Sequence, residues 1–86
     1  MSERLIGTIT HYFNGPGVAV IHVTEGELHQ GDRIHIVGHT SDFVEDVTSM
    51  EVEHEKVQTA GMGDEVALKV IERARVHDQV FKIVPG

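Results

Sequence analysis

The sequence predicts an all-β fold, a small closed six-stranded β-barrel that occupies residues 1–86 as a single domain. Apolar residues recur at every second position in most segments, which is the pattern of a half-buried strand. Clusters of glycine, proline, asparagine and aspartate separate these segments at short intervals. No segment has the spacing of an amphipathic helix of three turns. Short strands between closely spaced turns are typical of small barrels and sandwiches.

The first two predicted strands form a hairpin. The first strand alternates over residues 4–13, and the cluster Asn14-Gly15-Pro16-Gly17 then reverses the chain. The second strand is the β-branched run 18–23, of which Val18 and Val20 are expected in the core. Phe13 is also expected in the core.

A tight excursion precedes the third strand. Leu28 is the only apolar residue of the polar loop 25–32, so we expect its side chain to fold back over an open end of the barrel. Gly31 is expected to have a positive φ, which other residues adopt only at a cost. The strand that follows, 33–38, places Ile34 and Ile36 on the core face.

The fourth predicted strand, about 43–52, breaks the period-two spacing. Val47 and Met50 are three residues apart, so both can face inward only if a β-bulge intervenes at Thr48-Ser49. Two further strands complete the set. One follows the turn 61–64 and buries Val66 and Leu68, and the other spans 79–84.

Composition and charge restrict the classes of function. The net charge is −7, and acidic proteins bind nucleic acid weakly because phosphate contacts depend on lysine and arginine. No cysteine is present, which excludes disulfides, thiolate metal sites and a cysteine nucleophile. The segment 42–55 is acidic and has no lysine or arginine. The densest basic group is Lys69, Arg73 and Arg75, which share one parity and are expected on one strand face.

No catalytic, cofactor or metal site is predicted. The seven histidines are scattered without the spacing of a metal site, and no serine has an evident base and orienting group. The sequence also lacks the Gly-x-x-x-x-Gly-Lys-Ser/Thr loop that holds nucleotide phosphates, so we expect no GTP binding. The chain is therefore predicted not to be an enzyme.

Several short elements occur in an order that resembles domain 2 of translational GTPases of the elongation factor Tu type. These elements are Leu28-x-x-Gly31-Asp32, Gly38, Val47-x-Ser49-Met50 and Ala60-x-x-Gly63-Asp64-x-Val66. The segments 10–13, 38–43 and 78–82 further resemble stand-alone translation elongation factor-like proteins and the C-terminal barrel of the collagenase-like peptidase family, some of whose members take part in RNA hydroxylation. The resemblance implies a barrel of the translation-factor domain 2 type.

Two hypotheses of function follow from this resemblance. In the first, the chain is a non-catalytic RNA-binding or translation module that contacts RNA, a ribonucleoprotein or a translation-machinery protein, with Lys69, Arg73 and Arg75 at the interface. In the second, it is an accessory subunit that binds protein and completes a separately encoded enzyme. The acidic balance favours a protein partner over bare RNA. We expect a cytoplasmic location without membrane contact, because neither a signal pattern nor a membrane-spanning apolar run is evident.

Overall fold

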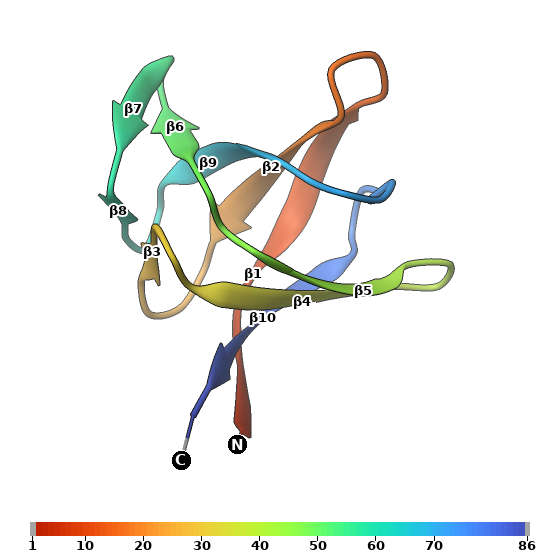
Figure 1. The fold of residues 1–86 in the computed structure, drawn as a ribbon, viewed down its shortest axis with the longest axis horizontal. Helices are drawn as coiled ribbons and strands as arrows, with labels where there is room; N and C mark the ends of the chain where they lie inside the picture. The colour runs from red at the N-terminus through yellow and green to blue at the C-terminus, as the bar shows by residue number, and fades with distance from the viewer. Residues whose placement is uncertain (1, 86) are drawn as a thin grey trace.

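The computed structural model describes residues 2–85, which form strands and turns only (Figure 1). Within this range no helix is long and apolar enough to cross a membrane. The strands follow one another as β1 (Ser2–Phe13), β2 (Val18–Val23), β3 (Leu28–His29), β4 (Arg33–Val37), β5 (Asp42–Asp46), β6 (Met50–Val52), β7 (Glu55–Val57), β8 (Thr59–Ala60), β9 (Glu65–Lys69) and β10 (Gln79–Val84).

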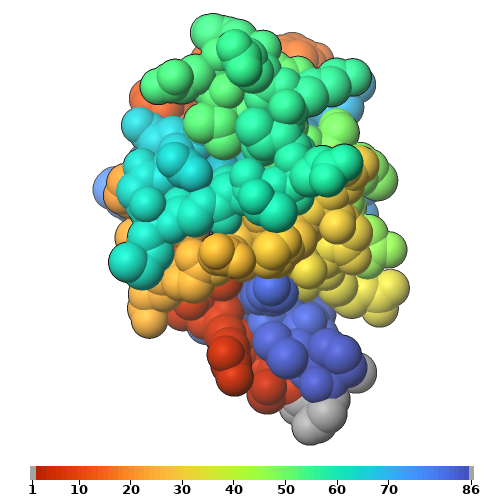
Figure 2. Space-filling model, turned by 90° about the vertical axis from the view of Figure 1, so that its left-hand side faces the viewer, coloured from red at the N-terminus to blue at the C-terminus, as the bar shows by residue number. Residues whose placement is uncertain are grey.

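Eight strands form one antiparallel sheet in the order β5-β4-β10-β1-β2-β9-β6-β7, and β3 pairs with β8 in a second, two-stranded sheet. The all-β prediction is confirmed. The strands are more numerous than predicted because the predicted strand 43–52 is divided into β5 and β6 and because the short β3, β7 and β8 are added. Figure 2 shows the side on which β3 lies against the segment of β7 and β8, with the ends of β1 and β10 projecting below. No ladder joins β5 to β7 within residues 2–85, so closure into a barrel stays a prediction.

The core confirms most of the predicted inward-facing residues and corrects one strand. Ile34, Ile36, Val66 and Leu68 are buried. In β2, however, Val18 and Val20 are only half-buried, and the opposite face (Ala19, Ile21 and Val23) is fully enclosed. The prediction for β2 was wrong because both faces of this strand are apolar. His22 shares the face of Val18 and Val20, so burying the other face keeps the imidazole partly in water.

Strand β1 changes its inward face along its length. Its register shifts between Leu5 and Gly7 and again between Ile9 and His11, which marks two bulges. These bulges explain why Phe13, predicted in the core, has 51% of its surface exposed. They bend β1 so that it can pair with β10 along one half and with β2 along the other.

The predictions for the loop 25–32 and for the segment 47–50 are largely confirmed. Leu28 is completely buried, and Gly31 has a φ of 96°. Val47 and Met50 both face inward, with 2% and 1% exposed. Between them the strand is interrupted rather than bulged, because Val47 bonds across to another loop. Its N–H donates to the Asp32 carbonyl and its carbonyl accepts from the Gly31 N–H, both at 2.8 Å.

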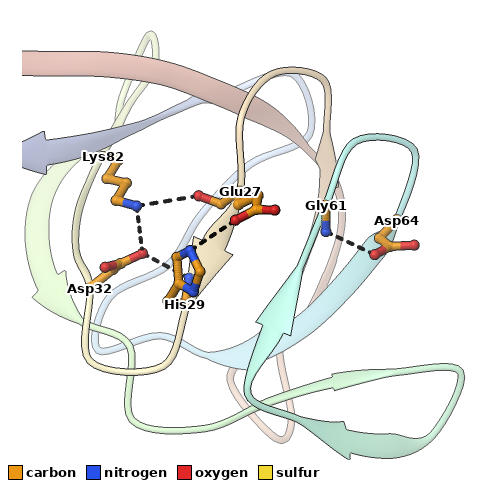
Figure 3. A network of polar contacts seen from close by, with 6 residues as sticks. All are labelled: Glu27, His29, Asp32, Gly61, Asp64 and Lys82. Atoms are coloured by element: carbon orange, nitrogen blue, oxygen red, sulfur yellow. Dashed lines mark hydrogen bonds and ion pairs between the residues drawn. The ribbon is translucent and has the colours of Figure 1, made fainter.

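Three of the strands begin with the same aspartate turn. In each, the aspartate carboxylate accepts a hydrogen bond from the backbone N–H three residues earlier, and its own N–H donates back to that residue's carbonyl. The third residue of each turn has a positive φ, as a type II turn requires. Figure 3 shows the first two turns. The three turns are His29–Asp32, Gly61–Asp64 and Arg75–Asp78.

The β6–β7 hairpin is strained at its tip. Glu53 and His54 form its two-residue loop and have φ values of 52° and 66°. Such loops favour Asn-Gly, because asparagine and glycine adopt positive φ at little cost. We predict that Glu53→Asn with His54→Gly raises the free energy of unfolding by about 1 kcal/mol, measured by urea denaturation. Thr40→Gly, at a turn position without positive φ, is the control and should not raise the free energy of unfolding. An unchanged midpoint in the double variant would contradict the prediction.

Candidate functional site

The most distinctive surface of the molecule, here called the loop end, consists of the β1–β2 hairpin tip 12–17 and the β9–β10 connection 70–78. The two segments are bonded to one another and to β1. The Val70 N–H donates to the Gly17 carbonyl at 3.0 Å. At the other end of the connection, the His77 N–H donates to the Ile9 carbonyl at 2.8 Å. The loop end therefore has a defined backbone although it lacks regular strand structure.

Buried side chains hold the middle of the connection. Glu45 of β5 accepts a hydrogen bond from the Ile71 N–H at 2.8 Å, and burial raises the pKa of this carboxyl. The buried Asp78 carboxylate accepts from the Arg75 N–H at 2.8 Å. Between these anchors Ala74 is 1% exposed. The bond to Glu45 thus fixes the connection to β5, and the bond to Asp78 holds the last turn of the connection closed.

Large apolar side chains nevertheless face solvent at the loop end. Ile71 is 70% exposed, Val76 49% and Phe13 51%. The Phe13 ring stacks on the ring of His11, with centroids 6.3 Å apart. Val76 also lines a shallow hollow of about 240 Å³, together with Tyr12, Arg73, Ala74 and Arg75. The surface combines apolar side chains, an aromatic ring and arginine, which are enriched in protein interfaces.

The basic residues chosen from the sequence lie partly on this surface, but not on one strand face. Lys69 is the last residue of β9, whereas Arg73 and Arg75 belong to the connection. The parity argument was wrong because the strand stops at Lys69 instead of continuing. Among residues 2–85, none of the three forms an ion pair. By contrast, Arg33 pairs with Asp46 at 3.0 Å.

Sequence reasoning missed the apolar part of the loop end. Phe13 was assigned to the core, and neither Ile71 nor Val76 was singled out. A signal was present for Phe13, because it shares the parity of the polar His11 in the second half of β1. For the other two residues the sequence carries no periodic signal, since the connection is irregular.

A larger hollow lies elsewhere and is lined by polar and apolar residues in about equal measure. It measures about 540 Å³ and is lined by residues of β1, β10 and the β2–β3 loop. Two cationic residues, Arg4 and Lys82, line it. Lys82 is already engaged, with Nζ 3.2 Å from the Asp32 carboxylate and 3.5 Å from the Glu27 carbonyl (Figure 3). The ammonium group of Lys82 is therefore already occupied by groups of the chain itself.

A histidine between two carboxylates joins three strands. His35 of β4 places Nδ1 3.0 Å from the Glu3 carboxylate and Nε2 2.5 Å from the Asp42 carboxylate. Hydrogen bonds to Asp42 and then to Glu3 raise the pKa of His35 above its ordinary value of 6.5. No group of three potential ligands among residues 2–85 is arranged to hold a metal ion. We interpret the cluster as a structural ion network.

The His35 network should make stability depend on pH. Because the folded-state pKa is raised, protonated His35 stabilises the fold fully below 6.5, and this contribution is lost as the pH rises through the raised pKa. The difference in free energy of unfolding between the chain and its His35→Gln variant is therefore expected to be larger at pH 5.5 than at pH 8.5. Urea denaturation at both pH values measures it. His39→Gln, on the exposed β4–β5 turn, controls for the loss of a histidine. If the His35→Gln variant differs from the unmodified chain equally at both pH values, the stabilising role of the His35 network is contradicted.

Comparison with known proteins points to peptidase families. The chain is 32% identical over 81 residues to a protein named collagenase from Porphyromonas gingivalis, covering 93% of this chain and 22% of that protein. It is 34% identical over 77 residues to an uncharacterized protease of Methanocaldococcus jannaschii, covering 88% of this chain and 19% of the protease. The chain thus spans about a fifth of the length of the curated relatives it matches. No family model matches it.

The fold has a solved counterpart. The C-terminal domain of a Geobacillus thermoleovorans protein designated a U32 peptidase superposes with a TM-score of 0.87 and 17% identity. The match covers 94% of this chain and 93% of that domain. At this identity the likeness shows the fold alone.

These findings correct the first functional hypothesis. The part of the resemblance that pointed to the collagenase-like peptidase family is supported, and nothing in the comparisons indicates a translation factor. A translation or RNA-binding module with RNA, a ribonucleoprotein or a translation protein as its partner is therefore the wrong reading. It arose because the Leu-x-x-Gly-Asp and Gly-x-Gly-Asp elements encode turns before strands, which describe the fold and not the partner.

Proposed function

We propose that the chain is a non-catalytic accessory module that binds a peptidase-family domain carried on another chain. The observation that carries this proposal is the coverage of the sequence matches. They take in about nine-tenths of this chain but only about a fifth of proteins named collagenase and protease. A region of that size fits an appendage of a larger protein.

The polar chemistry of the described residues supports a binding role. The close polar groups serve the fold: aspartates cap turns, Lys82 ties two loops together, and His35 joins strands. No serine among them is hydrogen-bonded through its side chain to a histidine. A nucleophile needs such a base to be activated. This polar chemistry fits a module that would contribute to catalysis through a partner.

Two finer sequence predictions accompany this proposal. Closure of the sheet into a barrel is supported by the segment 42–52, which pairs at the β4 edge through β5 and at the β9 edge through β6. A cytoplasmic location rests on the sequence alone.

Affinity capture tests the proposal. The tagged chain is used as bait in lysate from its own source organism, with and without ribonuclease, and bound proteins are identified by mass spectrometry. We expect a peptidase-family protein to be retained in both samples. We also expect less of it to be retained when the salt concentration is high. Capture that disappears with ribonuclease, or that yields only ribosomal proteins, would overturn the proposal.

A further inference from the structure

We propose that the loop end is the docking surface of this chain and that it takes an acidic face with a protruding apolar side chain on the peptidase-family domain. This inference rests on the proposed function and specifies where and how that partner binds. It is carried by three observations: a fixed backbone, exposed apolar side chains, and arginines without ion pairs.

The first observation is that the loop end is ordered before any partner binds. Four hydrogen bonds, all between 2.8 and 3.0 Å, fix the connection at Val70, Ile71, Arg75 and His77. Binding costs less free energy when the interface is ordered in advance, because fewer degrees of freedom are lost.

The second observation is the placement of apolar surface. Phe13, Ile71 and Val76 are each at least 49% exposed, although they stand on this ordered framework. Of the three, Val76 lines the 240 Å³ hollow, which is large enough for one apolar side chain and has Ala74 among its lining residues. Aromatic and arginine side chains around a small pocket are the composition of binding hot spots.

The third observation is charge complementarity. The chain carries a net charge of −7, so an acidic partner is repelled by most of its surface. Arg73 and Arg75 line the hollow, and neither is neutralised by a carboxylate of residues 2–85. An acidic face can therefore approach favourably at the loop end, which also fixes the orientation of the complex.

A titration with matched variants tests this docking surface. The probe is a collagenase-like protein of the same organism, purified without the region that this chain resembles. Calorimetry measures the dissociation constant. We expect Arg73→Glu with Arg75→Glu to weaken binding at least tenfold. The control is Arg4→Glu with Lys56→Glu, two exposed residues outside the loop end that change the net charge equally and should bind like the unmodified chain.

The apolar contribution has its own matched pair. Ile71→Ser is expected to weaken binding at least tenfold, whereas Met62→Ser should leave it unchanged, although the two side chains are 70% and 69% exposed. Both variants should keep the melting temperature, because exposed positions contribute little to stability. If the unmodified chain binds and these loop-end variants bind equally well, the docking surface is wrong and the proposed function survives. If the unmodified chain does not bind, the proposed function itself fails, and RNA binding lost in the Arg73/Arg75 variant would replace it.

Discussion

Gly7→Ala is expected to destabilise the chain by about 3 kcal/mol or more, enough to unfold much of a domain this small. A Cβ at Gly7 would overlap the backbone carbonyl oxygen of His22 and lie 3.0 Å from its carbon. That carbonyl belongs to the β1–β2 ladder and cannot move without breaking the pairing of the two strands. The bulge beside Gly7 also gives β1 the bend that lets it pair with β10.

Chemical denaturation followed by circular dichroism measures this effect. Gly15→Ala is the matched control, because no atom lies within 4 Å of its added methyl group and its φ is not positive. It should change the free energy of unfolding by less than about 0.5 kcal/mol. Equal stability of the two variants would show that the close approach of β1 and β2 at Gly7 is absent.

Gly38→Ala is expected to have the second largest effect, a loss of about 2 kcal/mol. The added methyl group would occupy the place of the Asp78 carboxylate. This carboxylate is 4% exposed and caps the Arg75 N–H, so moving it breaks the turn that shapes the loop end. The variant should therefore lose stability and also weaken binding of the partner.

A double-mutant cycle isolates the clash. Asp78→Ala removes the cap and should itself cost about 2 kcal/mol. Once the carboxylate is gone, the methyl group at position 38 has room, so the double variant should be about as stable as Asp78→Ala alone. Additive losses measured by urea denaturation would place the two residues apart and refute the contact.

The sequence predicted the parts of the fold that depend on local pattern. Ile34 and Ile36 alternate with Arg33 and His35, and Gly31 precedes an aspartate in a turn, so periodicity and turn chemistry were sufficient there. Periodicity failed where the two faces of a strand are both apolar, as at Val18 and Val20. The bulges of β1 were also out of reach, because their positions depend on which strands pair on each side.

The candidate site was predicted only in part. Arg73 and Arg75 were found from charge density, but the partner assigned to them was wrong. The exposed Ile71 and Val76 could not be found, because the hydrogen bond from Ile71 to Glu45 joins residues far apart in sequence. Such a contact follows from the curvature of the whole sheet. Turn motifs describe the fold and not the partner, so the function inferred from them was wrong.

Calorimetric titration of the unmodified chain with the purified peptidase-family region tests the central claim most directly. A parallel titration uses a single-stranded RNA oligonucleotide at the same low salt. We predict saturable binding of one chain per peptidase region, weakened as the salt concentration rises, and no heat beyond dilution with RNA. Saturable RNA binding with no heat from the peptidase region would contradict the account.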